Sequence, residues 1–147
     1  MQVPIPNRAT QHLSKLALFT PSPRVGGEVP TLAAGEEIFG IYRNNVDVPT
    51  RGILITSTGL HIQFVSHAQY VPYSDIKDML WHTWDRKELE SCENRRLLVE
   101  LGNGERLELH IVGGRAGGLD LSQFHNFLLG AVQTRHLEGR RVIRQPI

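Results

Sequence analysis

The residues of this sequence that could do chemistry are its histidines, its one cysteine and a glycine-rich loop. The seven histidines form no H-x-H or H-x-x-x-H pair with a nearby acid, so their spacing predicts no metal site. Cys92 lies between Glu90 and Glu93, acidic surroundings that disfavour a nucleophilic thiolate. No G-x-S-x-G motif is present. We therefore predict neither an enzymatic activity nor a bound metal or cofactor.

The glycine-rich loop at 113–118 precedes an expected helix, which is where phosphate-binding loops occur. Its spacing matches neither G-x-G-x-x-G nor the P-loop. Asp120 would also place a negative charge where a phosphate would bind. We interpret the loop as a connector and retain Arg115 as a candidate contact for an anion.

Composition excludes several classes of protein. The chain has 147 residues, is 40% hydrophobic and carries 16 Lys+Arg against 15 Asp+Glu. It is too apolar for a disordered chain and too neutral to be mainly a nucleic-acid binder. One cysteine cannot form an internal disulfide. No apolar run approaches the roughly 20 residues of a transmembrane helix, and we predict a cytoplasmic location.

Period-two alternation of apolar residues predicts a mainly antiparallel β structure in the central part of the chain. The expected strands cover residues 37–43, 51–56, 60–65, 70–73, 76–84, 97–101 and 105–111, with a polar loop at 85–94. The last two strands predict their own register. A two-residue turn would put Glu100 and Arg106 on the core face, whereas a three-residue loop pairs Val99 with Leu107 and gives Gly104 a left-handed conformation.

The expected elements at the two ends of the chain are helical. Asp120 and Gln123 have the spacing of a capping box, after which Leu121, Phe124, Leu128 and Val132 form an apolar stripe that we expect to end near Gly139. His61 and His110 are expected on outward strand faces. Residues 1–27 are acid-free, which is typical of an organellar presequence. We favour instead a short helix within 9–19, capped by Asn7 and packed on the domain, followed by a linker at 20–27.

Three stretches of this sequence resemble the pleckstrin-homology-like superfold, in particular its small bacterial PH-like and GRAM-like domains. The stretches are Gly52–Ile62, Tyr70–Ile76, and Leu107–Ile111 followed by the helix from Asp120. The resemblance implies an α+β, mainly β fold: a partly open barrel of about seven antiparallel strands capped by a C-terminal helix. The expected organisation is an N-terminal helix and linker at 1–34, the domain at 35–138 and a basic tail at 139–147.

Members of this superfold bind proteins, peptides or phosphoinositides, and few are enzymes. The resemblance implies a lipid site around the first hairpin, where Arg43 and Arg51 are the only bases and Asp47 lies between them. Because this basic cluster is incomplete, the favoured hypothesis is a bacterial accessory or immunity-type module that binds a protein partner or its own copies. Anionic lipid is the alternative. The candidate aromatic anchors are Tyr70, Tyr73, Trp81 and Trp84.

Overall fold

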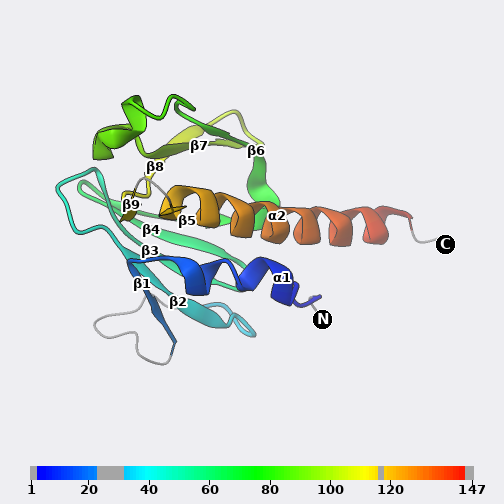
Figure 1. Ribbon diagram of the computed structural model, residues 1–147. Helices are drawn as coiled ribbons and strands as arrows, with labels where there is room; N and C mark the ends of the chain where they lie inside the picture. Colours follow the sequence, from blue (N-terminus) through cyan, green and yellow to red (C-terminus); the bar gives the residue numbers. More distant parts are fainter. Residues whose placement is uncertain (1–2, 23–31, 116–117, 145–147) are drawn as a thin grey trace.

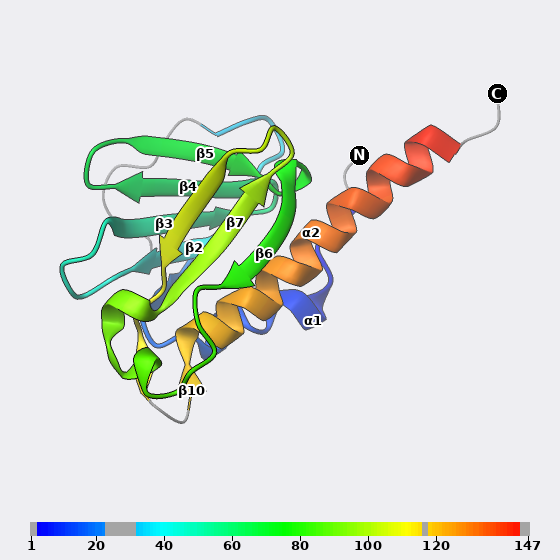
Figure 2. The same ribbon diagram turned by 90° about the horizontal axis from the view of Figure 1, so that it is seen from above.

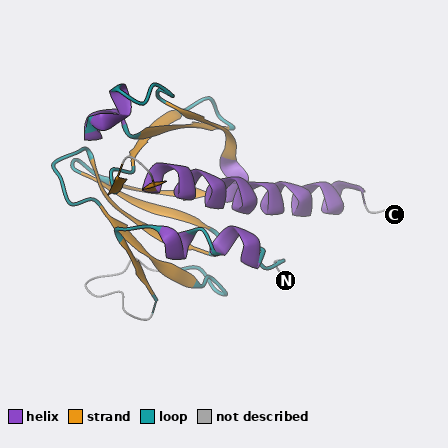
Figure 3. Cartoon of the chain, viewed as in Figure 1, coloured by secondary structure: helices purple, strands orange, loops and turns teal. Residues whose placement is uncertain are grey.

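Alternating apolar residues fold the centre of the chain into two antiparallel sheets, seen in the computed structural model (Figures 1 and 3). The structure describes residues 3–22, 32–115 and 118–144. The five-stranded sheet has the order β1 (Phe19–Pro21), β2 (Ile38–Arg43), β3 (Thr50–Thr56), β4 (Gly59–Phe64) and β5 (Ala68–Pro72). The three-stranded sheet has the order β6 (Ile76–Trp81), β7 (Arg96–Leu101) and β8 (Arg106–His110).

The remaining elements are helices and short turns. The helices are α1 (Asn7–Thr10) and the long C-terminal α2 (Asp120–Arg144). Four 3-10 turns, Leu13–Lys15, Tyr73–Asp75, Glu88–Glu90 and Cys92–Asn94, and a short hairpin of β9 (Gly114–Arg115) and β10 (Gly118–Leu119) complete the described structure. The predicted α+β, mainly β class is confirmed. The two sheets do not close into a barrel, and membership of the PH-like superfold stays a prediction.

The register predicted for the last hairpin is confirmed. Val99 pairs with Leu107 and Leu97 pairs with Leu109, and Gly104 has a φ of 90°. The core therefore receives the apolar side of each strand, as the alternation requires. The polar stretch at 85–94, expected to be a loop, contains two of the 3-10 turns.

Helix α2 packs across the open side between the two sheets, and its C-terminal half extends beyond them (Figure 2). The predicted apolar stripe is buried, and Phe127 and Ala131 are fully buried with it. Phe127 packs edge-on against Phe39 of β2 and against Tyr73, so it joins the helix to the larger sheet. The predicted helix end at Gly139 is wrong, because α2 continues to Arg144. Among the described residues, no helix combines the length and apolarity that a membrane span requires.

The N-terminal segment docks on α2 and differs from the predicted helix. Helix α1 is four residues long, and its N-cap is Pro6 rather than Asn7. Its Ala9 is buried and lies so close to Gly130 of α2 that a Cβ added to Gly130 would be 2.5 Å from the Ala9 Cβ. Thr20 and Pro21 were expected in the linker but belong to β1. Apart from Ser22, the rest of the expected linker lies outside the described residues.

The residues expected to cap α2 bind the N-terminal segment instead. The buried carboxylate of Asp120 accepts hydrogen bonds from the backbone N–H of Ala17 at 2.8 Å and from the hydroxyl of Tyr42 at 2.9 Å. Gln123 Oε1 lies 2.7 Å from His12 Nδ1. The predicted capping box is therefore wrong, since these side chains satisfy partners more than 70 residues away in sequence. They join α2 to the N-terminal segment and to β2.

Candidate functional site: a hollow on the outer face of the larger sheet

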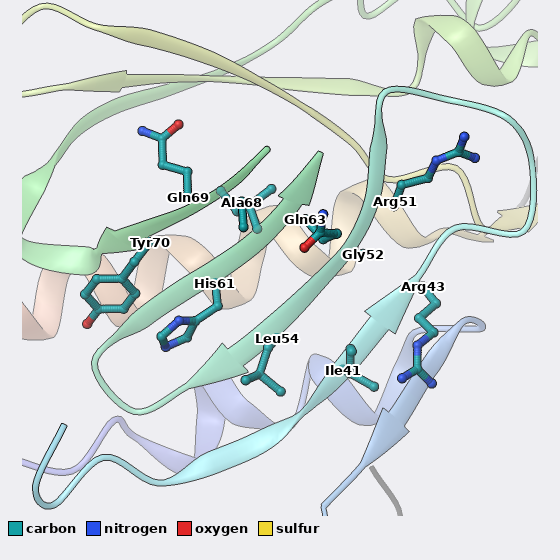
Figure 4. Close-up of a pocket in the computed structure, with 11 residues that line it drawn as sticks. Ile41, Arg43, Arg51, Gly52, Leu54, His61, Gln63, Ala68, Gln69 and Tyr70 are labelled. Atoms are coloured by element: carbon teal, nitrogen blue, oxygen red, sulfur yellow. The ribbon is translucent and has the colours of Figure 1, made fainter. Parts of the chain in front are cut away.

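The outer face of the larger sheet carries two cross-strand rows of side chains. The first row is Ile41, Leu54, His61 and Tyr70, and the second is Arg43, Gly52, Gln63 and Ala68, as Figure 4 shows. Their sequence neighbours on the same strands point inward and build the core. Side chains from four strands are therefore brought into one surface, and in Figure 4 the helices lie behind the strands that carry it.

These rows line a hollow of about 650 Å³. Such a volume falls within the range of pockets that bind ligands or peptide side chains. Gly52 leaves its position on the floor without a side chain, and Ile41 and Leu54 make the floor beside it apolar. The lining includes two guanidinium groups, those of Arg43 and Arg51, and no carboxylate.

Arg51 is partly neutralised by an exposed acid. Its guanidinium lies 3.1 Å from the carboxylate of Asp47, whose side chain is 91% exposed. Such an exposed pair contributes about 1 kcal/mol or less to stability. A carboxylate brought by a ligand could therefore replace Asp47 at little cost.

A buried carboxylate organises the opposite end of the hollow. Glu36 has a side chain that is only 2% exposed. Its Oε2 atom accepts hydrogen bonds from Thr56 Oγ1 at 2.5 Å and from Thr58 Oγ1 at 2.8 Å, and it lies 2.9 Å from His61 Nε2. Thr58 in turn lies 2.7 Å from the hydroxyl of Tyr70. One acid thus holds together a loop, the β3–β4 turn and two strands.

This network sets the ionisation of Glu36. Burial acts to raise its pKa, but the hydrogen bonds from Thr56, His61, Ala33 and Thr58 outweigh it and lower the pKa to about 2. Glu36 is therefore ionised at neutral pH, which makes it an acceptor for each donor around it. For the neighbouring Tyr70, burial raises the pKa, and the charge of Glu36 adds to that effect.

The ionised carboxylate also orients His61. Because Glu36 can only accept, the Nε2 atom of His61 carries the proton that they share. The ring is further held by Tyr70, whose centroid lies 4.5 Å away. In the described part of the chain no residue is hydrogen-bonded to Nδ1. A carboxylate behind a histidine can orient a general base or a ligand-binding imidazole.

Three of the predicted site residues come together in this hollow, and they are Arg43, Arg51 and Tyr70. Tyr73 does not join them: it is fully buried, and its hydroxyl donates to the carbonyl of Thr56 at 2.6 Å. The prediction of Tyr73 as a surface anchor is therefore corrected. Its position at the chain reversal after β5 turns it into the core.

The other aromatic candidates lie on the second sheet. Trp81 is 9% exposed and donates from Nε1 to His125 Nδ1 of α2 at 2.8 Å, so it is a core residue. Trp84 is 65% exposed and stacks on Trp81 with a centroid distance of 4.3 Å. Only Trp84 of the pair is available to a partner. Arg115 belongs to β9, and its side chain lies outside the described residues.

Sequence reasoning missed Glu36 and assigned the wrong surroundings to one of two histidines. Glu36 precedes the first long strand and is 25 residues from His61, so no local spacing relates them. His61 was expected on an outward face, and it is there. His110 was also expected outside, but it is 6% exposed, and burial lowers its pKa. In the described ranges, histidines, cysteines and acids form no group of three that could hold a metal.

No protein-family model, curated protein or solved structure matches this chain. The geometry of the hollow is therefore the basis for inferring a function.

Proposed function

We propose that this protein is a non-enzymatic binding module that recognises an acidic, extended segment of a protein partner in the hollow on β2–β5. The observation that carries the proposal is the lining of the hollow. An apolar floor lies between two guanidinium groups and an imidazole that a buried carboxylate holds in place. A segment with a carboxylate and an aliphatic or aromatic side chain would complement both features.

The mixture of residue types favours a protein partner. Arginine and tyrosine are enriched among residues that dominate protein interfaces, and Arg43, Arg51 and Tyr70 line the same hollow. The neutral amide of Gln63 lies in the row of Arg43 and could hydrogen-bond a peptide backbone. Arginine also binds carboxylates through two parallel hydrogen bonds, which gives direction as well as affinity.

The network around Glu36 supports binding more than catalysis. The hydroxyls of Thr56 and Thr58 donate to the same carboxylate that orients His61. Neither hydroxyl is therefore placed for activation by the imidazole, as a nucleophile would have to be. Because the imidazole is already held in place, its side chain loses little conformational entropy when a ligand binds.

Site-specific photocrosslinking in the producing cell tests the proposal. A photoreactive residue in place of Gln63, which is exposed and lines the hollow, should give a defined adduct with another protein. The matched control is the same probe in place of Glu90, which is exposed on the 3-10 turn between β6 and β7. The adduct should disappear in the variants Arg43→Glu and Arg51→Glu. The proposal is wrong if position 63 gives no adduct beyond those of position 90, or if both charge reversals leave it intact.

A second candidate function is binding to an anionic membrane surface, and the observation favouring it is that Arg43 and Arg51 line the same hollow. Each basic residue near such a surface contributes about 1 kcal/mol. Co-sedimentation with phosphatidylserine vesicles at low salt tests it. Binding that both charge reversals abolish would favour the membrane, and absence of binding would remove this candidate.

A further inference from the structure

In the described part of the chain the two sheets end in four edge strands, and three of these are protected against pairing with another strand. β1 is three residues long and ends in Pro21. β6 has a register shift between Ile76 and Asp78 and exposes the charged side chains of Lys77 and Asp78. β8 exposes the charges of Arg106 and Glu108. Short strands, proline, bulges and charges are the devices by which proteins prevent edge-to-edge association.

β5 is the edge strand that lacks most of this protection. It pairs with β4 over five residues without a register shift. Its sequence, Ala68-Gln69-Tyr70-Val71-Pro72, contains no charged residue, and its proline occupies the last position. Figure 2 shows β5 at the outer margin of the sheet. Tyr70 is 42% exposed there, and Ala68 is exposed as well.

The backbone groups that β5 leaves for a new strand follow from its pairing with β4. The N–H of Phe64 donates to the carbonyl of His67, and the N–H of Tyr73 donates to the carbonyl of Thr58. Bonded and non-bonded pairs alternate in an antiparallel ladder, so Gln69 and Val71 bond to β4. The N–H and C=O groups of Ala68 and Tyr70, and the C=O of Pro72, therefore point away from the sheet.

We propose that the β5 edge binds the β5 edge of a second copy of this chain, antiparallel about a two-fold axis at Tyr70. Each Tyr70 then exchanges backbone hydrogen bonds with its counterpart, and each Ala68 N–H donates to the carbonyl of the other copy's Pro72. This register tolerates the proline, because Pro72 is needed only as an acceptor. Two five-stranded sheets become one continuous sheet, with a hollow on each half.

The absence of charge on β5 identifies the occupant as a second copy. In a two-fold antiparallel pair the central residue faces itself, and a charge there would face a like charge. β5 instead places two uncharged Tyr70 residues opposite each other, with each ring held over its own β4 by His61 and Thr58. A foreign acidic segment would gain nothing from this uncharged edge. The pairing uses backbone groups of β5, so it does not depend on what the hollow binds.

Sedimentation equilibrium of the whole chain, from about 1 to 200 µM, tests the pairing, since a small interface of this kind is expected to have a micromolar dissociation constant. The wild-type chain should shift from the monomer mass to twice that mass. Ala68→Pro removes a donor that the fold itself does not use and should weaken dimerisation by at least about tenfold. Ala68→Thr keeps the donor and is the matched control, which should dimerise normally.

A second variant and a covalent readout keep the result independent of any folding defect in Ala68→Pro. Tyr70→Lys should abolish dimerisation, since like charges would face each other. In a Cys92→Ser background, Tyr70→Cys should form a disulfide-linked dimer, because Cα atoms of a bonded antiparallel pair are about 5.5 Å apart. Val65→Cys, 61% exposed beyond the end of β4, is the control that should remain monomeric.

Three outcomes would overturn the pairing: a wild-type monomer over the whole range, Ala68→Thr as disruptive as Ala68→Pro, or equal disulfide yields at positions 65 and 70. Arg43→Glu should leave the dimer intact while it disrupts the hollow. Loss of crosslinking at Gln63 with dimerisation retained therefore implicates the hollow, and the reverse result implicates the β5 edge.

Discussion

Replacing Glu36 with glutamine removes the charge from a carboxylate that the fold has surrounded with hydrogen-bond donors. Glutamine has nearly the same shape, but its NH₂ group cannot accept a hydrogen bond. The NH₂ group must replace either Oε1, which accepts from the Ala33 N–H, or Oε2, which accepts from the Thr56 and Thr58 hydroxyls. The donors on that side then lose their acceptor. The substitution therefore tests the role of the charge itself.

The expected magnitude follows from the pKa of Glu36. Its value is lowered from 4.5 to about 2 in the folded protein. A depressed pKa stabilises the folded state above the unfolded value, and this stabilisation is lost as pH falls through the folded value. The shift corresponds to roughly 3 kcal/mol near neutral pH, of which about 2 kcal/mol is lost by about pH 3.

Urea unfolding of the wild type and of Glu36→Gln, at several pH values between about 7 and 3, measures this effect. We expect the variant to be less stable by roughly 3 kcal/mol near neutral pH, and the gap to narrow to about 1 kcal/mol at about pH 3. Other carboxylates titrate in both proteins, so the difference isolates Glu36. A gap that stays constant with pH would refute the argument that Glu36 is held ionised by its donors.

Three further predictions concern the packing of α2. Gly130→Ala places a methyl group against Ala9 and should cost about 1–3 kcal/mol and loosen the N-terminal segment, which limited proteolysis would detect. Asp120→Ala leaves buried donors without an acceptor and should cost about 3 kcal/mol in chemical unfolding. Burial lowers the pKa of His125, so stability should fall as pH drops below about 6.5, by up to about 1.4 kcal/mol per pH unit, and His125→Gln should reduce that slope.

Each of these predictions has a matched comparison. Gly102→Ala adds the same methyl group where the nearest atom is 3.8 Å away, so it should be nearly neutral, and an equal loss would contradict the packing argument. Asp120→Asn keeps one acceptor and should fall between wild type and alanine. His110 also has a pKa lowered by burial, so a residual slope is expected in His125→Gln, and an unchanged slope would exclude His125 as its source.

Local patterns predicted the parts of the fold in which one face of an element is buried. A one-residue shift in the last hairpin would bury Arg106 or Glu100, so the alternation itself selected the pairing of Val99 with Leu107. The same reasoning placed His61 on the outer face of β4. In a strand or helix the buried residues share one face, and the spacing of apolar residues along the sequence indicates which face is buried.

What local patterns could not predict depends on partners far apart in the sequence. Asp120 and Gln123 have the spacing of a capping box. In the folded protein their side chains instead contact Tyr42, Ala17 and His12, because the N-terminal segment docks on α2 and brings those groups within hydrogen-bonding distance. The extension of α2 past Gly139 has a similar origin, since a glycine costs only about 1 kcal/mol in a helix.

The candidate site shows the same division. The sequence alone gives the residue types and positions of Arg43, Arg51 and Tyr70. The alternation of side chains along a strand directs those of Arg43 and Tyr70 outward. Only the order of the strands makes them line one hollow, and only the path of the chain before β2 puts Glu36 behind His61. Side-chain periodicity is local and can be read along the chain, whereas the alignment of strands and the burial of a charge depend on contacts that exist only in the folded molecule.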